Sequence, residues 1–261
     1  MKNELSILIA SFSKAYDIWN ITDYYFNKYW SDNPYKVFLG ANGNDKKKYC
    51  PKKWLYINKG ADLSWSKSMI DYLNCINTKY VLVYLDDFAL TNNVVTNSID
   101  TIIDFMNKDN SKMVRLSSRP KPDVKINSMI GRISIKDRVP YSTSLQAAIW
   151  DKEFLLDLLK YDFNPWQFET KAGKTNEAFK NSDKFYATYN SILEYKHFVE
   201  KGKFLSFIKE NAKNDGIFLD INNRLFWDKS DMNTNISSKI YQYIPNKYKN
   251  KIRKIFNKDE L

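Results

Sequence analysis

Two adjacent acidic residues, Asp86 and Asp87, stand directly after the longest apolar run of the sequence, Tyr80–Leu85. Neighbouring carboxylates repel each other unless a cation offsets their charge. Proteins hold Mg²⁺ with one or two carboxylates together with substrate phosphates, and Mn²⁺ accepts the same oxygen ligands. The pair therefore predicts a site for Mg²⁺ or Mn²⁺ and a diphosphate. The alternative is that one Asp caps the following helix and the other faces solvent.

A third carboxylate, Glu169, lies between the aromatic residues Trp166 and Phe168. We interpret residues 164–169 as a turn, because they begin with Asn-Pro. The flanking rings would shield Glu169 partly from water, which suits a general base. Glu169 is therefore the candidate catalytic base, with Asp162 as the nearest substitute. The alternative is a solvated glutamate that caps the next segment.

The elements around Asp86 and Asp87 follow an alternating pattern. Short apolar runs predict strands at residues 6–10, 36–39, 54–57, 80–85 and 112–116. Apolar residues at helical spacing predict helices over residues 18–29, 64–76 and 95–106, the second of them capped by Ser64. This alternation predicts an α/β fold with a mostly parallel central sheet flanked by helices. Ligands bind at the carboxyl ends of such strands, which is where the acidic pair stands.

The second half of the chain has a less regular pattern. Residues 117–140 contain three prolines, and together with Arg115 they hold four of the six arginines of the chain. We interpret this region as a loop with one irregular strand, whose arginines either neutralise a phosphate or lie in solvent. Residues 145–150 predict a strand, and Asp151 is expected to cap a short helix that includes residues 154–159.

Part of this pattern resembles the nucleotide-sugar half of the GT-A glycosyltransferases. A strand is followed by Ser-Trp-Ser-Lys at 64–67, which opens a helix, and then by Tyr-Val-Leu-Val-Tyr-Leu-Asp-Asp-Phe at 80–88. Asp86 and Asp87 stand where the DxD-type motif of that family stands. The resemblance implies a GT-A, Rossmann-like fold. The sequence lacks the spaced second Asp of the full motif, so the resemblance leaves metal dependence open.

The downstream segments resemble the acceptor half of bacterial capsule and lipopolysaccharide glycosyltransferases. They are Ser-Leu-Gln-Ala-Ala-Ile-Trp at 144–150 and Pro-Trp-Gln-Phe-Glu at 165–169. The resemblance covers roughly residues 5–205. It implies a catalytic domain over residues 1–205, followed by a C-terminal extension over residues 206–261. Within the domain, residues 1–116 would form the nucleotide-sugar half and residues 117–205 the acceptor half.

The resemblance also implies roles for single residues. The nucleotide-sugar donor would contact residues that follow strands or open a helix, namely Ala10, Ser11, Phe12, Asn42, Trp65, Lys67 and Asp86. Asp87 would be the main metal ligand, and Asp86 would contact the ribose or the metal. The acceptor would contact Trp166, Gln146 and Trp150, with Glu169 as the base.

The implied activity is inverting transfer of a sugar from a nucleotide-diphosphate sugar, with UDP expected, to a glycan or lipid-linked glycan in bacterial surface polysaccharide synthesis. One alternative is a sugar nucleotidyltransferase, which usually carries a glycine-rich loop after its first strand; residues 10–13 contain no glycine. Another is a nucleic-acid-binding module, suggested by the net charge of +11 and the aromatic content of 16%.

The positive charge is concentrated near the C-terminus. Residues 1–231 hold 34 basic and 28 acidic residues, so almost half of the net charge belongs to residues 232–261. This distribution argues against the nucleic-acid-binding alternative. Apolar residues at helical spacing predict two short basic amphipathic helices around Pro245, the first over residues 236–244 and the second over residues 248–256. Such helices bind anionic membrane surfaces, which predicts a peripheral position on the inner face of the bacterial cell membrane.

Few residues can form other kinds of site. Cys50 and Cys75 show no CxxC spacing, so we expect neither a disulfide framework nor a thiolate zinc site. His197 is the one histidine, which excludes a multi-histidine metal centre. We interpret it as a surface residue, with a contact to metal or diphosphate as the alternative. The longest apolar run has six residues, far below the ~20 that a spanning helix needs, so we expect a cytoplasmic chain.

Overall fold

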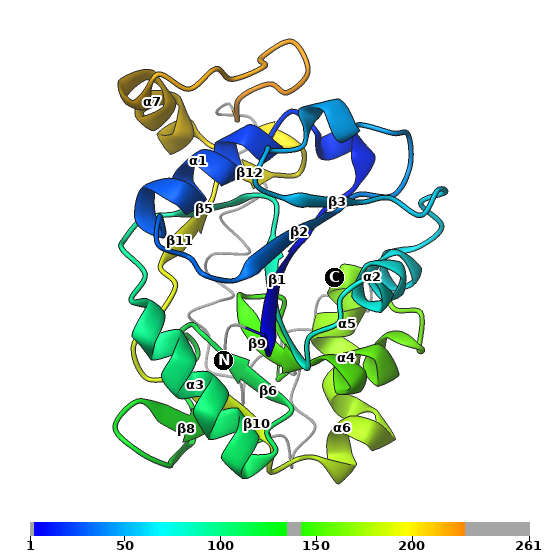
Figure 1. Cartoon of the computed structure of the whole chain (residues 1–261), viewed down its shortest axis with the longest axis vertical. Helices are drawn as coiled ribbons and strands as arrows, with labels where there is room; N and C mark the ends of the chain where they lie inside the picture. The colour runs from blue at the N-terminus through cyan, green and yellow to red at the C-terminus, as the bar shows by residue number, and fades with distance from the viewer. Residues whose placement is uncertain (1–2, 135–141, 228–261) are drawn as a thin grey trace, which may run out of the picture. The chain divides into compact units, whose positions relative to one another are not determined.

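The computed structural model describes residues 3–134 and 142–227 (Figure 1). The chain divides into two compact units, Met1–Phe198 and Val199–Leu261. The first unit is built around a nine-stranded sheet with the order β3-β2-β1-β4-β9-β6-β10-β8-β7. Its strands are β1 (Leu5–Ala10), β2 (Lys36–Gly40), β3 (Leu55–Ile57), β4 (Tyr80–Leu85), β6 (Met113–Arg115), β7 (Val124–Lys125), β8 (Ile130–Arg132), β9 (Ala148–Asp151) and β10 (Phe185–Thr188).

The centre of the sheet confirms the predicted α/β fold. The strands β1, β2, β3 and β4 are mutually parallel. Strand β9 then enters antiparallel between β4 and β6, so that β6 runs in the same direction as β4. Strand β10 is parallel to β6, while β8 and β7 complete the edge with antiparallel pairing. The prediction of one irregular strand in residues 117–140 is therefore wrong, because this region pairs as the two short strands β7 and β8.

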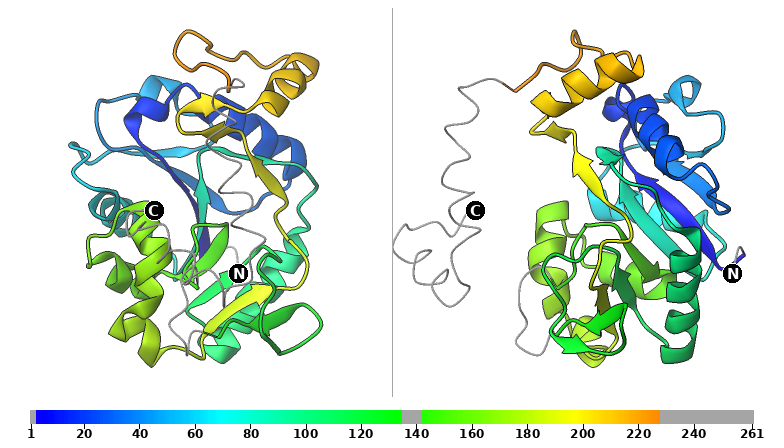
Figure 2. Two further views of the ribbon diagram at one scale, coloured as in Figure 1. Left: turned by 180° about the vertical axis from the view of Figure 1, so that it is seen from behind. Right: turned by 90° about the vertical axis from the view of Figure 1, so that its left-hand side faces the viewer.

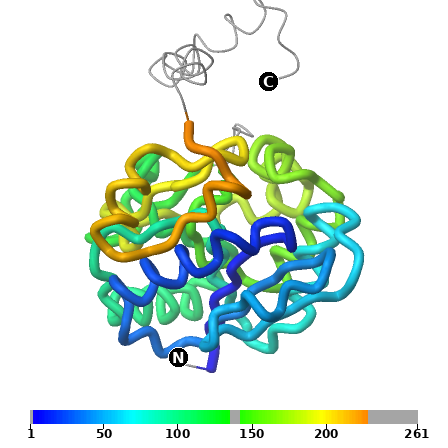
Figure 3. The backbone as a smooth tube through the Cα atoms, turned by 90° about the horizontal axis from the view of Figure 1, so that it is seen from above, coloured from blue at the N-terminus to red at the C-terminus, as the bar shows by residue number. Residues whose placement is uncertain are grey.

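Helices cover both faces of the sheet (Figure 2). They are α1 (Trp19–Tyr29), α2 (Trp65–Asn74), α3 (Thr96–Asp109), α4 (Lys152–Leu159), α5 (Pro165–Lys171) and α6 (Asn176–Lys180), with 3-10 turns η1 (Ser13–Ala15), η2 (Lys47–Tyr49) and η3 (Ala172–Lys174). Helices α2, α4, α5 and α6 share one core with alternate residues of the strands. On the other face the Phe26 ring of α1 meets Tyr84 edge-on, so α1 and α2 lie on opposite sides of β1 (Figure 3). The alternating burial follows from the two-residue period of a strand.

Helix α5 corrects the sequence interpretation of residues 164–169. Asn164 and Gln167 form a complete capping box, in which each side chain bonds the backbone N–H of the other residue. Pro165 stands at the first helical position. The backbone N–H at this position has no hydrogen-bond partner within a helix, so the missing N–H of proline costs nothing. The segment is therefore a helix and not a turn, and it holds Glu169 on a rigid element.

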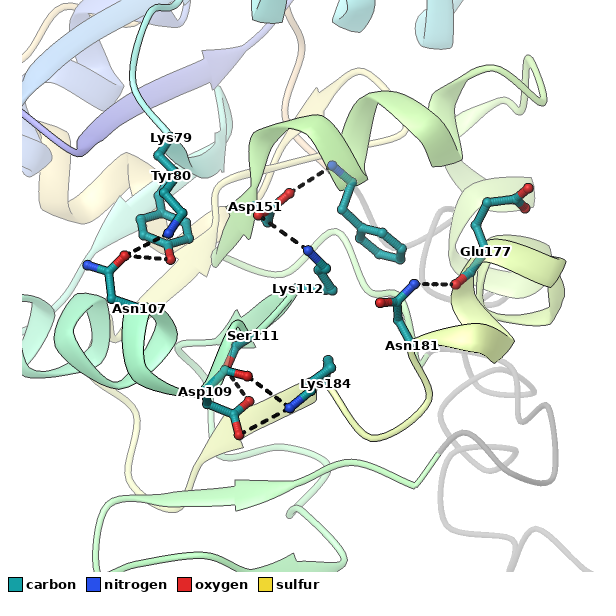
Figure 4. Close-up of polar contacts among 11 residues, drawn as sticks. Lys79, Tyr80, Asn107, Asp109, Ser111, Lys112, Asp151, Glu177, Asn181 and Lys184 are labelled. Atoms are coloured by element: carbon teal, nitrogen blue, oxygen red, sulfur yellow. Dashed lines mark hydrogen bonds and ion pairs between the residues drawn. The ribbon is translucent and has the colours of Figure 1, made fainter.

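The opposite edge of the sheet, where β4 and β6 begin, is held by polar pairs (Figure 4). Lys112 Nζ lies 3.6 Å from Asp151 Oδ2. The other oxygen of Asp151 accepts a bond from the Phe154 N–H at 2.9 Å, as the predicted helix cap requires. Lys184 lies 3.5 Å from Asp109 in the same region. These contacts pair the charged groups with one another, so they account for stability at this edge.

The second unit begins with a small hairpin. Strands β12 (Val199–Glu200) and β13 (Lys203–Phe204) pair antiparallel. The two residues between them, Lys201 and Gly202, have φ angles of 48° and 77°, as a type I′ hairpin turn needs. Helix α7 (Ser206–Asp215) follows and ends at Gly216. The amphipathic helices predicted at residues 236–244 and 248–256 lie outside the described residues. Within residues 3–134 and 142–227, no helix has the length and apolar character needed to cross a membrane.

Candidate functional site

The carboxyl ends of β1 and β4 are joined through Asp86. Its Oδ2 accepts a hydrogen bond from the Ser11 hydroxyl, which directly follows β1. The same hydroxyl oxygen accepts a bond from Trp19 Nε1 at 2.8 Å. Thr22 in turn donates to the backbone carbonyl of Asp86. These contacts bring together two of the residues predicted for the donor site, Ser11 and Asp86, and fix the carboxylate by protein donors.

Asp87 contacts a residue from the far end of the first unit. Its Oδ2 lies 3.0 Å from Nδ1 of His197, across a separation of 110 residues. The contact forms because β11 (Tyr195–His197) pairs antiparallel with β5 (Phe88–Leu90), directly after Asp87. The Asp87 side chain is 19% exposed and the His197 side chain 51%. His197 is thus a surface residue, as expected, and it also contacts a more shielded carboxylate, which the sequence did not predict.

The β5–β11 ribbon also places Tyr195 at the same edge. Its ring stacks on Phe88 with a centroid distance of 3.9 Å, and its hydroxyl oxygen accepts a bond from the Ala147 N–H at 3.2 Å. Burial raises the pKa of Tyr195 to about 12, with smaller contributions from the charges of Asp87, Arg115 and Glu169. The hydroxyl is therefore a proton donor at neutral pH. Tyr195 is on the same short strand as His197, which contacts Asp87, and its hydroxyl bonds the segment that leads into β9.

Glu169 is oriented by the segment that leads into β9. Its Oε1 accepts bonds from the Leu145 N–H at 2.9 Å and from the Ser144 hydroxyl at 3.2 Å. Within the described part of the chain, no hydrogen bond to its Oε2 is present. One oxygen therefore fixes the carboxylate while the other can take a proton, which is the arrangement a general base needs.

Several predicted donor residues lie around the start of α2. Ala10 is buried at the end of β1, whereas Phe12 is exposed. The rings of Trp65 and Phe168 meet edge-on, with their centroids 5.3 Å apart. Lys67 Nζ lies 3.4 Å from Asp162 Oδ2. Trp65 and Lys67 are in the first turn of α2. Their contacts with Phe168 and Asp162 place this turn next to the acceptor half.

Asp162, the predicted substitute for Glu169, is engaged elsewhere. The hydroxyl of Ser64 donates a hydrogen bond to its carboxylate. This bond, aided by Lys67, lowers the pKa of Asp162 below its ordinary value. A base with a lowered pKa accepts protons less readily, so the geometry favours Glu169.

Asn42 has a structural position that differs from the predicted contact with the nucleoside. It is buried, its Nδ2 donates to Asp71 at 2.9 Å, and its Oδ1 accepts from the Lys59 N–H at 2.8 Å. Its backbone N–H donates to the Tyr72 hydroxyl at 2.7 Å, and that hydroxyl reaches the Ser11 carbonyl at 3.3 Å. The Asn42 side chain therefore holds the loops after β1 and β2 in place and is not free to bind a ligand.

The three predicted acceptor residues differ in exposure. Trp150 is 2% exposed and packs against Phe168 inside the core, so the prediction that it stacks on a sugar is wrong. Trp166 is 45% exposed on α5 and can meet a ligand. Gln146 has a buried Oε1 that lacks a hydrogen-bond partner. The structure thus leaves Trp166 and Gln146 as candidates for the acceptor.

A metal ion at this edge would have two protein ligands. Within residues 3–134 and 142–227, there is no group of three or more His, Cys, Asp or Glu side chains that could hold a metal ion. The Asp87 carboxylate and the His197 imidazole supply one oxygen and one nitrogen. This donor set fits an ion that completes its coordination with substrate phosphates and water, as Mg²⁺ and Mn²⁺ do.

The sequence matches no family model and no curated protein. The fold is similar to that of a fragment of S. aureus TarS, residues 1–349, in complex with UDP-GlcNAc, at 14% identity and a TM-score of 0.50. That alignment covers 76% of this chain and 60% of the fragment, so this chain spans about three fifths of the fragment's length. A UDP-glucose pyrophosphorylase aligns with a TM-score of 0.45 at 8% identity, over 75% of this chain and 92% of that one. The comparison establishes the GT-A-like α/β fold.

Proposed function

We propose that this protein is a glycosyltransferase that moves a sugar from a nucleotide-diphosphate sugar to a hydroxyl of a glycan acceptor, with inversion at the anomeric carbon. The observation that carries the proposal is the Asp87–His197 contact on the ribbon whose Tyr195 hydroxyl bonds Ala147, two residues from the Leu145 N–H that orients Glu169. A pair that could hold a divalent ion and a carboxylate that could act as a base match the needs of this reaction. The UDP-GlcNAc bound by the TarS fragment supports UDP as the nucleotide.

In the proposed reaction, Asp87 and His197 would hold a divalent ion. When bound, the ion neutralises charge that develops on the leaving diphosphate. Asp86, oriented by Ser11, contacts the ribose. Glu169 takes the proton from the acceptor hydroxyl as its oxygen bonds to the anomeric carbon. The bond from that carbon to the diphosphate oxygen breaks at the same time, and the nucleoside diphosphate leaves.

Thermal-shift titration tests the donor class first. UDP, GDP and CMP are compared with and without Mn²⁺, because a ligand that binds the folded state raises the melting temperature. We expect the largest shift for UDP with Mn²⁺, and UDP release from a UDP-sugar when acceptor is added. Pyrophosphate release from UTP and a sugar phosphate would identify a sugar nucleotidyltransferase instead. A steep salt dependence of oligonucleotide binding would favour the nucleic-acid-binding alternative.

The metal site predicts a specific effect of His197→Gln. We expect Mn²⁺ binding in the presence of UDP to weaken by about tenfold or more, since even groups that only orient metal ligands change affinity 10–100-fold. Electron paramagnetic resonance of free Mn²⁺ measures this without turnover. Glu194→Gln is the control, because it removes a carboxylate next to β11 that does not contact Asp87. Equal Mn²⁺ affinity in the two variants would show that His197 is not a ligand.

We also propose that the acceptor is lipid-linked and that residues 232–261 hold the enzyme at an anionic membrane. Seven Lys and Arg residues in this segment border the apolar stripes of the predicted helices, and each contributes ~1 kcal/mol of attraction to anionic lipid. A chain that ends at Ser230 is expected to keep its activity on a soluble acceptor but not to sediment with anionic vesicles. Zwitterionic vesicles are the control. Equal sedimentation of both chains, or unfolding on truncation, would disprove the membrane role.

A further inference from the structure

One segment of the acceptor half carries unpaired positive charge. Residues 115–134 contain five basic residues and one acidic residue, Asp123. The basic residues are Arg115, Arg119, Lys121, Lys125 and Arg132. Among the ion pairs of residues 3–134 and 142–227, none includes any of the five. Lysines at the opposite edge of the sheet are paired with Asp109 and Asp151, so this segment differs from its surroundings.

Arg115 is the most unusual of these residues, because it is only 1% exposed. Its Nε donates to the Ser117 carbonyl at 3.3 Å, and its Nη2 donates to the Pro120 carbonyl. Its Nη1 is buried and has no hydrogen-bond partner. Burial lowers the pKa of Arg115 to about 10, and the charges of Tyr195 and Asp123 oppose this shift only in part. Arg115 has carbonyl partners but no ion pair among the described residues. A buried charge without an opposite charge is costly, so an anion that arrives with the substrate would be bound favourably.

The position of Arg115 connects this charge to the candidate site. It is the last residue of β6 and pairs in register with Ala148 of β9. Because β6 and β4 run in the same direction, Arg115 lies at the sheet edge that carries Asp87. Gln146 comes two residues before Ala148 and has its own unpartnered buried oxygen. Leu116, the residue after Arg115, donates its N–H to the Ala147 carbonyl at 2.9 Å, and the Ala147 N–H donates to the Tyr195 hydroxyl at 3.2 Å.

We propose that the carboxyl edge of β6 is an anion subsite and that the acceptor carries a phosphate or carboxylate group, which Arg115 binds directly or through one water. This inference rests on the proposed glycosyl transfer and specifies its acceptor. The free Nη1 donates to the anionic oxygen, and Gln146 Oε1 accepts a bond from a hydroxyl of the same substrate. A guanidinium in a protein interior attracts an anion more strongly than one in water does. An uncharged glycan could still donate a hydroxyl to Gln146, but it would leave the buried Arg115 without an anionic partner.

Inorganic phosphate is the first probe, titrated into the full chain by calorimetry and thermal shift. We expect the wild type and the Lys108→Gln control, which removes a lysine from the opposite edge, to bind it equally. Arg115→Gln is expected to weaken binding by about tenfold or more, since a hydrogen bond to a charged group contributes ~1.5–3 kcal/mol. The double variant Arg119→Gln with Lys121→Gln changes only exposed side chains. It is expected to weaken binding several-fold, and it decides the test if Arg115→Gln does not fold.

The second measurement separates the two sources of phosphate. UDP release from a UDP-sugar is compared with a phosphate-bearing glycan, its uncharged counterpart, and a free sugar phosphate. If only the phosphate-bearing glycan stimulates UDP release, and Arg115→Gln abolishes this stimulation, the proposal is supported. If the free sugar phosphate stimulates UDP release, the subsite binds that smaller ligand. Equal phosphate binding in all variants, or equal use of charged and uncharged glycans, overturns it. If the anion subsite is overturned but the protein still hydrolyses a UDP-sugar slowly, the proposed glycosyl transfer remains supported. If phosphate binding depends on Arg115 but UDP does not bind, the anion subsite is supported and the proposed glycosyl transfer is contradicted.

Discussion

Asp87→Asn is expected to lower sugar transfer and donor hydrolysis by about 10³-fold or more. The Asp87 carboxylate contacts His197 at 3.0 Å, and its negative charge would hold a divalent ion there. A metal ion supplies several kcal/mol of stabilisation to developing charge, and each 1.36 kcal/mol is tenfold in rate. The amide of Asn keeps the shape but removes the charge. UDP release from a UDP-sugar, with excess Mn²⁺, measures the loss.

Asp86→Asn is the matched comparison for this experiment. Asp86 accepts the Ser11 hydroxyl and stands at the end of β4 next to β1. We therefore expect weaker donor binding, with a smaller loss of rate at saturating donor. Both variants should keep the melting temperature of the wild type within a few degrees, because neither carboxylate lies in the core. Unchanged turnover in Asp87→Asn would refute the assignment of this carboxylate to the metal.

The elements that sequence reasoning predicted well are those with local signals. The six apolar residues Tyr80–Leu85 form β4 with the predicted bounds. Ser64 caps α2 by accepting the Lys67 N–H, as Ser before a helical apolar pattern indicates. In both cases the residues that decide the structure are neighbours along the chain. The position of Asp86 and Asp87 at a strand end follows from β4 alone.

The elements that were missed depend on distant pairing. Strand β9 was predicted, but its antiparallel place between β4 and β6 has no signal in its own residues. Strands β5 and β11 pair although they lie about a hundred positions apart in the sequence. No pattern in the sequence indicates that these two strands are partners. The contact of His197 with Asp87 is a consequence of this ribbon. The sequence therefore predicted the surface position of His197 but not its contact with Asp87.

The two tryptophans predicted to contact the acceptor differ in burial. Trp150 and Trp166 have the same chemistry, yet the strand places the first in the core and the first turn of α5 exposes the second. The burial of Trp150 follows from its in-register contacts with β4 and β6 on both sides. A central strand of a covered sheet buries both of its faces. Once β9 is known to be central, the tryptophan is expected to be a core residue.

Glu169→Gln is expected to lower the rate of transfer by ~10² or more while donor affinity is kept. The substitution preserves the capped helix α5 and leaves an oxygen that can accept the Leu145 N–H. The amide cannot take up a proton, so only the base function is removed. Single-turnover transfer at saturating UDP-sugar measures the rate, and calorimetry measures donor affinity.

Glu177→Gln provides the control for this experiment, since Glu177 lies on α6 and bonds the Tyr161 hydroxyl, away from the Tyr195 hydroxyl. It should leave both quantities unchanged. The pH profile adds a readout that a structural role would not move, because a general base produces an acidic limb in the rate that disappears with Gln. Parallel loss of UDP-sugar binding in Glu169→Gln would instead mark Glu169 as a structural residue. A normal rate would transfer the role to Asp162, although its lowered pKa makes it the weaker base.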